Sequence, residues 1–171
     1  MITSNTTPEP RYRQLFEEMY KLCIENDWGD PFSYARSREI NMAGVLGHTI
    51  SDTLSGADGI DKSGNKVEYK STTQKRITAL YSGISNKPTW EEQGRYLTEE
   101  KIGCYPYHFI ARFESGKIVE MWKAPGDKVL EILMPKLEKD FYRKKVSQPS
   151  DPRLSAGLSM TDIKEIAVRV I

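Results

Sequence analysis

Cysteine and histidine are scarce in this sequence, which contains two of each among its 171 residues. Neither Cys23 nor Cys104 belongs to a cluster of the kind that binds zinc. A disulfide-bonded scaffold and a structural zinc site are therefore not needed to explain the fold. A lone cysteine is usually a small buried hydrophobic residue, and two such residues are compatible with a reducing cytoplasm.

Long hydrophobic runs are also missing. No stretch approaches the ~18 apolar residues that a membrane span requires, and residues 1–10 lack the basic and apolar regions of a secretory signal. We therefore expect a cytoplasmic location and no membrane partner. The formal net charge is only +1, which argues against a protein that coats nucleic acid through charge alone. Local positive charge is nevertheless present in two basic clusters, around residues 62–76 and 136–145.

A chain of this length can form one domain with a proper hydrophobic core. We expect a single domain over residues 1–171, of the α/β class, with a mixed central sheet of about five strands flanked by helices. Residues 1–10 have no regular pattern and are predicted to be disordered. Residues 11–50 contain two helical patterns, and the apolar stripe of the first is typical of a core or dimer contact.

The expected helices and strands follow from hydrophobic periodicity and from breaks at proline and glycine. Pro135 should kink or divide the last helix, and the residues between 74 and 90 are expected to form a polar loop. Helices are predicted at 11–26, 37–48, 90–101 and 127–139, and strands at 66–72, 105–113, 117–124 and 166–171.

Residues 55–73 have the pattern of a β-hairpin and carry three chemically useful side chains: Asp58, Glu68 and Lys70. In the second arm of the hairpin, apolar and charged residues alternate, which is the period of a β-strand. Glu68 and Lys70 should therefore point to the same face, about 7 Å apart along the strand.

The length of the turn decides which aspartate joins them. A three-residue loop at Ser63–Asn65 would pair Asp58 with Lys70 and place it on the face of Glu68. A loop of two or four residues would place Asp61 there instead, because a shift of one residue reverses the face. The sequence leaves both aspartates open.

Two carboxylates on neighbouring strands offer hard oxygen ligands, which suit a Mg²⁺ ion that keeps several of its waters. A nearby lysine can orient a metal-bound water or stabilise a pentavalent phosphate, so the set suits hydrolysis of a phosphodiester. The alternative is an ordinary surface hairpin, in which Glu68 and Lys70 form an exposed ion pair worth ~0–1 kcal/mol.

The spacing of these residues resembles the PD-(D/E)xK nuclease motif, with Ala57 at the place of the proline. The order of elements over residues 47–139 is similar to that of the small homodimeric type II restriction endonucleases of the PvuII kind. The resemblance implies Asp58, Glu68 and the main-chain carbonyl of Tyr69 as ligands of Mg²⁺. It implies Lys70 as the group that positions the attacking water.

The same resemblance implies a restriction-endonuclease-like fold and two partners, double-stranded DNA and a second copy of the chain. A two-fold homodimer matches a symmetric site in duplex DNA and places one catalytic centre on each strand. Residues 11–50 would contribute to the dimer contact, 55–124 would form the catalytic hairpin and sheet core, and the tail, 147–171, could return to the DNA. Two other functions are open: a repair or junction-resolving nuclease on the same scaffold, and a non-catalytic DNA-binding module.

Several polar residues are candidates for DNA contacts, because the loop after the catalytic strand enters the DNA groove in enzymes of this kind. For any one of them, an ordinary solvent-exposed role is the alternative. The candidates are Tyr81, Ser82, Ser85, Asn86, Lys144 and Lys145. Two further residues have open roles. Glu39 is either an additional acidic group of the site or an exposed helix residue, and His108 is expected to serve in packing or structural hydrogen bonding.

Overall fold

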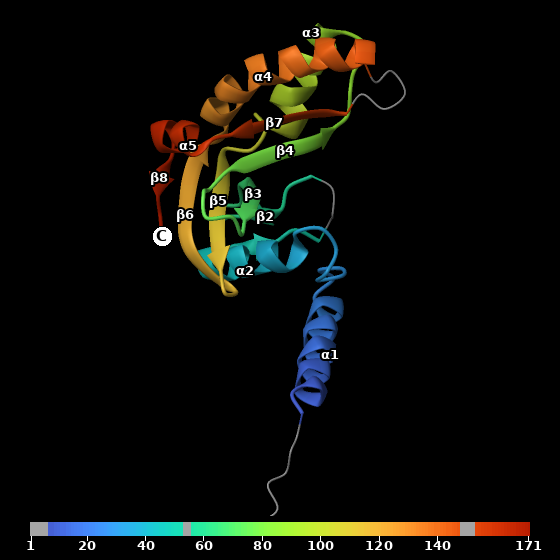
Figure 1. The fold of residues 1–171 in the computed structure, drawn as a ribbon, viewed down its shortest axis with the longest axis vertical. Helices are drawn as coiled ribbons and strands as arrows, with labels where there is room; N and C mark the ends of the chain where they lie inside the picture. Colours follow the sequence, from blue (N-terminus) through green and yellow to red (C-terminus); the bar gives the residue numbers. More distant parts are fainter. Residues whose placement is uncertain (1–6, 53–55, 148–152) are drawn as a thin grey trace, which may run out of the picture.

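The computed structural model describes residues 7–52, 56–147 and 153–171. Within these ranges the chain forms a mixture of helices and strands whose order is typical of an α/β fold (Figure 1). In chain order they are α1 (Glu9–Glu25), α2 (Arg36–Leu46), β1 (Thr49–Ile50), β2 (Gly59–Ile60), β3 (Lys66–Thr72), β4 (Ala79–Ile84), α3 (Trp90–Tyr96), the π-helix η1 (Leu97–Lys101), β5 (Tyr107–Glu114), β6 (Lys117–Pro125), α4 (Gly126–Ser147), β7 (Leu154–Leu158), α5 (Met160–Ile166) and β8 (Val168–Arg169).

The main sheet is mixed, which confirms the predicted fold class. Its six strands have the order β1-β2-β3-β5-β6-β8, and β4 pairs with β7 in a separate two-stranded sheet. The pair β3–β5 is parallel, whereas the other pairs are antiparallel. Parallel strands require a crossover connection, and β4, α3 and η1 supply it here.

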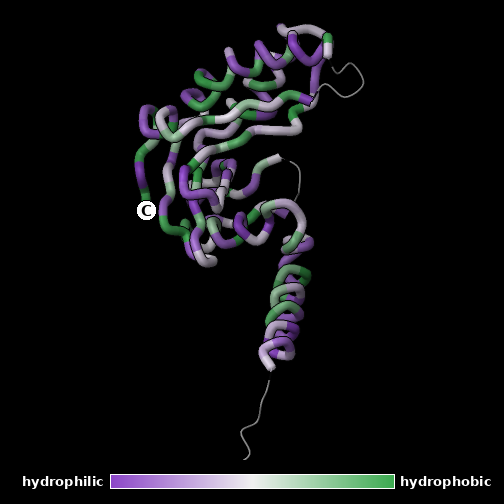
Figure 2. The backbone as a smooth tube through the Cα atoms, in the orientation of Figure 1, coloured by the Kyte–Doolittle hydropathy of each residue, from purple (hydrophilic) through white to green (hydrophobic). Residues whose placement is uncertain are grey.

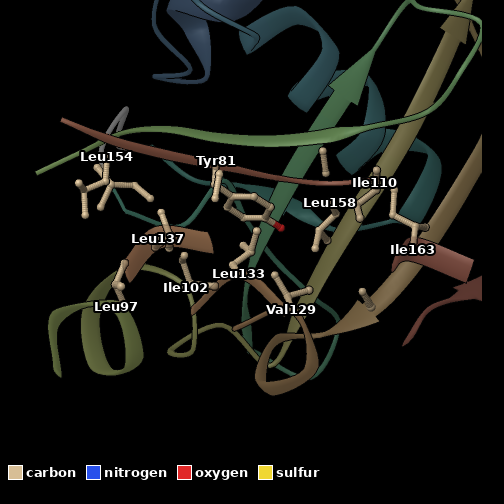
Figure 3. Packing of buried hydrophobic residues seen from close by; sticks show 14 of the residues in the cluster. Tyr81, Leu97, Ile102, Ile110, Val129, Leu133, Leu137, Leu154, Leu158 and Ile163 are labelled. Atoms are coloured by element: carbon tan, nitrogen blue, oxygen red, sulfur yellow. The ribbon is translucent and has the colours of Figure 1, made fainter. Parts of the chain in front are cut away.

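The hydrophobic core has two parts, one on each face of the main sheet. Along β5 the buried side chains alternate: Phe109 belongs to the cluster beneath α2, and Ile110 belongs to the cluster that α4, β4 and β7 cover. This is the period of two of a strand that is buried on both faces. Figure 3 shows the second cluster, in which Tyr81 lies among side chains that include Leu133 and Leu158.

The two-stranded sheet replaces the expected polar loop and extends the tail. Residues 74–90 were predicted to be a polar loop, but they contain β4, whose residues Ala79, Tyr81 and Ile84 are buried. Residues 154–158, for which no strand was predicted, form β7, the antiparallel partner of β4. Their short alternating patterns become strands because each strand supplies the hydrogen-bond partners of the other.

Helix α4 is longer than predicted and is not divided at Pro135. It runs from Gly126 to Ser147, and proline stands inside it. Leu133 and Leu137, on either side of the proline, are both fully buried in the same cluster. Their packing holds the two halves of the helix on one core, although proline removes a hydrogen bond from the helix interior.

Helix α1 projects away from the rest of the domain (Figure 1), and hydrophobic segments lie along it (Figure 2). It begins at Glu9, within the stretch predicted to be disordered; residues 1–6 lie outside the described part of the chain. Five of its large apolar side chains are exposed: Tyr12, Leu15, Phe16, Leu22 and Ile24. Among the described residues, every helix is too short or too polar to span a lipid bilayer.

A buried carboxylate joins β7 to helix α4. The side chain of Asp140 is only 6% exposed, and its Oδ2 atom accepts a hydrogen bond of 2.9 Å from the main-chain amide of Ser155. Arg143 contacts the other carboxylate oxygen, and the Nζ atom of Lys144 lies 3.4 Å from Oδ2. This carboxylate therefore links the start of β7 to the last turns of the helix.

We predict that Asp140→Ala lowers the free energy of unfolding by about 2–4 kcal/mol, because it leaves a buried amide and two basic groups without their partner. The matched control is Glu131→Ala on the same helix, where the carboxylate pairs with Lys128 in solvent. That exposed pair should contribute less than about 1 kcal/mol. Chemical denaturation of both variants measures the difference, and equal losses would contradict a structural role for Asp140.

Candidate active site

The hairpin has a longer loop than predicted, but its side chains lie on the predicted faces. Gly59 pairs with Val67 and Ile60 pairs with Lys66, so the loop contains the five residues Asp61–Asn65. The predicted pairing, with a three-residue loop, is therefore wrong by two residues. A shift of two residues leaves every side chain on its original face.

Asp58 lies beside the second arm of the hairpin, directly before the start of β2. Its main-chain amide donates to the carbonyl of Val67 at 3.0 Å. Its Oδ2 atom accepts a hydrogen bond of 2.7 Å from the amide of Tyr69. The carboxyl group is thus tied to the backbone of β3 between Glu68 and Lys70, and one of its oxygens has a fixed direction.

Asp61 has a different task, which is to close the hairpin loop. Its Oδ1 atom accepts hydrogen bonds from the amides of Ser63, at 2.8 Å, and Asn65, at 2.9 Å. The side-chain amide of Asn65 donates to Oδ2 at 3.0 Å. An aspartate that bonds the backbone in this way stabilises a turn. Of the two aspartates, only Asp58 lies next to Glu68 and Lys70.

Glu68 and Lys70 lie on one face of β3 and form an ion pair. The side chain of Glu68 is 8% exposed and that of Lys70 is 22% exposed. The pair is therefore not the solvent-exposed surface pair that the sequence also allowed. Removing an ion pair from water is costly unless its members have other favourable partners, so this burial distinguishes the pair from an ordinary one.

Two acidic groups, Asp58 and Glu68, share the single ammonium group of Lys70. Burial and the nearby Glu68 raise the pKa of Asp58 to about 7, although Lys70 acts in the opposite direction. Burial lowers the pKa of Lys70, but the carboxylates of Glu68 and Asp58 outweigh this effect and raise it overall. The site is consequently short of positive charge.

Glu39 approaches the same group from helix α2. Its side chain is 17% exposed and lies 3.5 Å from Nη1 of the buried Arg36. Burial raises the pKa of Glu39, and its charge acts on both Asp58 and Lys70. It is therefore not the exposed helix residue of the alternative interpretation, but a third carboxyl group close to the site.

The donor set can be compared with the requirements of a metal ion. Within the described ranges, no three His, Cys, Asp or Glu side chains are arranged to hold a metal by themselves. Mg²⁺ requires less, because it usually keeps several waters and binds through one or two carboxylates. Asp58 and Glu68 fit this requirement by their chemistry, and they do not fit a closed zinc site.

The structure corrects one predicted DNA contact. Tyr81 is 5% exposed and lies in the core, so it cannot reach DNA. Ser82 and Ser85, on and just after β4, are exposed. Asn86 is half-buried, and its Oδ1 atom has no hydrogen-bond partner within the described part of the chain.

The two predicted basic contacts have partners inside the domain. Lys144 contacts the main-chain carbonyl of Arg153, and Lys145 contacts that of Pro88. The ammonium group of Lys145 also lies 4.3 Å from the centre of the Phe141 ring. These lysines hold the last turns of α4 against neighbouring segments, and a DNA contact would require them to leave these partners.

Two side chains behind the site were not recognised from the sequence as its neighbours. The ammonium group of Lys70 lies over the ring of Tyr81, 5.0 Å from its centre, and the hydroxyl of Tyr81 bonds to His108. His108 makes structural hydrogen bonds, as expected. The apolar alternation at Ala79 and Tyr81 was the available signal for a buried strand at this position.

No protein-family model matches this chain, and no curated protein sequence is significantly similar to it. A relationship of residues 47–139 to restriction endonucleases therefore remains a prediction.

The raised pKa of Asp58 gives a prediction about stability. In the unfolded chain this carboxyl ionises near its ordinary value of 3.8, whereas in the folded protein it ionises near 7. Folding becomes less favourable as the pH rises between these values. The reason is that Asp58 must then carry its negative charge in a partly buried place beside Glu68. Asp58→Asn, which keeps an acceptor for the amide of Tyr69, should therefore raise the melting temperature at pH 8 and have little effect below pH ~4.

Because ~1 kcal/mol moves the melting temperature of a domain of this size by about 2–4 °C, the increase at pH 8 should amount to several degrees. Asp61→Asn is the control, and it should change the melting temperature in the opposite direction. Hydrogen bonds from Asn65 lower the pKa of Asp61, so its charge favours folding at neutral pH. Thermal melts from pH 3 to 9, without divalent ions, measure both effects. A lower melting temperature of Asp58→Asn at pH 8 would contradict the claim that the ionised Asp58 is unfavourable in the folded protein.

Proposed function

We propose that this protein is a Mg²⁺-dependent endonuclease of the cytoplasm, and specifically a type II restriction enzyme that hydrolyses phosphodiester bonds at a short symmetric site in duplex DNA. The observation that carries the proposal is the set of Asp58, Glu68 and Lys70. Two carboxyl groups and an ammonium group share one partly buried place at a hairpin, and the pKa of Asp58 is raised to about 7. Such perturbed groups are typical of functional sites.

The metal would be held by Asp58, Glu68 and the main-chain carbonyl of Tyr69. When bound there, Mg²⁺ would supply a Lewis acid for the phosphate and a water of lowered pKa. A divalent cation also compensates the charge that burial makes unfavourable at Asp58. The shortage of positive charge around these carboxyl groups thus supports a cation as their ligand.

The remaining steps belong to the side chains. The ammonium group of Lys70 can donate a hydrogen bond to the attacking water and can stabilise the negative charge that develops on the phosphate. Its partner Glu68 holds it near the backbone of β3. The amide of Tyr69 keeps Asp58 in one orientation, so little reorganisation is needed when substrate binds.

A second copy of the chain is the proposed protein partner. Helix α1 has 17 residues and exposes most of its apolar side chains. An isolated helix of this length is only marginally stable in water, and most helices depend on packing of their apolar face. A homodimer through α1 would provide this packing, and its two-fold axis would match a symmetric DNA site.

The proposed DNA contacts differ in how available they are. Ser82 and Ser85 are exposed and have hydroxyl groups that can bond to phosphates or base edges. Asn86 has a buried acceptor that lacks a partner among the described residues. Lys144 and Lys145 could bind phosphates only after leaving their partners in the domain.

We predict that the purified protein cleaves an unmethylated phage genome into discrete fragments with Mg²⁺, and is inactive with EDTA or Ca²⁺. Electrophoresis of the digest distinguishes the candidate functions. A smear would indicate an unspecific nuclease, and cleavage of four-way junctions alone would indicate a junction-resolving enzyme. Binding without cleavage of any DNA would favour a non-catalytic binding module.

The second functional prediction concerns the three site residues. Asp58→Asn, Glu68→Gln and Lys70→Met should each reduce the cleavage rate by about 10²–10³-fold or more, because each removes a metal ligand or a group that stabilises transition-state charge. Rates are measured under single-turnover conditions, after circular dichroism has shown that each variant is folded.

Asp61→Asn is the matched control, because it alters a carboxylate of the same hairpin that closes the loop. It should lower thermal stability and leave the cleavage rate within about threefold of the wild type below its melting temperature. A folded, inactive Asp61 variant beside an active Asp58 variant would overturn the assignment of the metal ligand.

A further inference from the structure

The ammonium group of Lys70 faces the ring of a tyrosine from the other sheet. Its Nζ atom lies over the ring of Tyr81, 5.0 Å from the ring centre. Tyr81 comes from β4 and is 5% exposed, so water is largely excluded on this side. A cation over an aromatic face is attracted by the ring quadrupole, and the attraction is stronger when the pair is desolvated.

The ring of Tyr81 is held in one orientation by a short chain of hydrogen bonds. Its hydroxyl lies 2.8 Å from Nδ1 of His108, and Nε2 of His108 lies 3.0 Å from the carbonyl oxygen of Ile102. Because the carbonyl can only accept, Nε2 carries the hydrogen and Nδ1 accepts from the hydroxyl. Burial lowers the pKa of His108 to about 4, which keeps the imidazole neutral at neutral pH.

This chain of contacts runs directly behind the site. His108 is the register partner of Glu68 in the parallel pair β3–β5. The rings of Tyr81 and His108 are 5.6 Å apart and tilted by 54°. Figure 3 shows the tyrosine among buried aliphatic side chains of the same cluster, with Leu133 beside its ring. The ring therefore has little freedom to move away from the ammonium group.

Lysine has a flexible four-carbon side chain, and its ammonium group has no preferred plane. Three carboxyl groups, on Glu68, Asp58 and Glu39, attract this group from three segments of the chain. A fixed aromatic surface on one side limits the positions that the ammonium group can take. It does so without adding a charge to a site that already contains several.

We propose that Tyr81 is a positioning residue for Lys70, and that its ring sets the direction in which the ammonium group points. The inference deepens the proposed function and rests on it where cleavage is concerned. It assigns β4 a part in the site that the motif residues alone do not indicate. The buried pair of Tyr81 and His108 acts through Lys70, and neither residue touches the substrate.

The first test does not depend on cleavage. Ring currents should shift the ε-proton signals of Lys70 upfield in the NMR spectrum of metal-free protein labelled with ¹³C-lysine, and Lys70→Arg identifies these signals by their loss. Tyr81→Phe keeps the ring and should keep the shift, whereas Tyr81→Leu should abolish it. Unshifted Lys70 signals in the wild-type protein would overturn the proposal without any variant of the core.

The matched control is a second lysine–tyrosine pair, both members of which lie in the main sheet. The Nζ atom of Lys123 lies 3.6 Å from the centre of the Tyr107 ring, and Tyr107 belongs to the other core cluster. Tyr107→Leu should change the signals of Lys123 and leave those of Lys70 in place. A change at Lys70 in this control would show that its shift reports general repacking and would overturn the assignment to Tyr81.

The second test measures the effect of Tyr81 on kcat separately from its effect on the KM for DNA. In folded protein, Tyr81→Leu should reduce kcat about tenfold, the loss expected for one cation–aromatic contact. The KM for DNA should stay within about twofold, because Tyr81 is buried and does not contact DNA itself. Tyr81→Phe should retain most of kcat, and this rescue by a ring without a hydroxyl distinguishes positioning from loss of stability.

The possible failures are distinguishable. If the wild-type protein cuts no DNA, the proposed function fails, and the Lys70 signals still decide whether Tyr81 orients the ammonium group. If the wild-type protein cuts DNA and folded Tyr81→Leu has the same kcat, the positioning role is wrong although the nuclease assignment stands.

Discussion

The interaction on which the site depends is the sharing of one ammonium group, that of Lys70, among carboxyl groups from three segments. Glu68 pairs with it along β3, Asp58 comes from the first arm of the hairpin, and Glu39 comes from α2. Partly buried charges of one sign cannot all be ionised without a large cost. The raised pKa of Asp58 is the visible result. Each neighbouring element therefore contributes to the site by fixing one member of this unbalanced group.

Much of this arrangement could be predicted from the sequence because it depends on the period of a strand. The alternation in residues 66–72 correctly placed Glu68 and Lys70 on one face, and the fold class followed from similar patterns. The choice between Asp58 and Asp61 could not be made, because it depends on the turn. There the side chain of Asp61 bonds to the backbone and makes a five-residue loop more favourable than a shorter one.

The strand β4 could not be predicted with equal ease, because its partner β7 lies much later in the chain. An exposed serine and a glycine interrupt its apolar residues, so the local pattern resembles that of a loop. The sequence accordingly predicts Tyr81 as a DNA contact, although it is part of the core. The lysines of the second basic cluster show what local charge alone leaves out. Their charge predicts a DNA contact, and the structure adds contacts of Lys144 and Lys145 to carbonyl groups of neighbouring segments.

The pairing of β4 with β7 has a consequence for the order in which the protein is made. The motif hairpin leaves the ribosome well before β7, which is the only strand that pairs with β4 among the described residues. Contacts between distant segments form late, since the loop between them must first be closed. A nascent chain that ends before residue 154 has Asp58, Glu68 and Lys70 but lacks the strand that holds Tyr81 behind them. The sequence order thus delays completion of the site until residues 154–158 have been made.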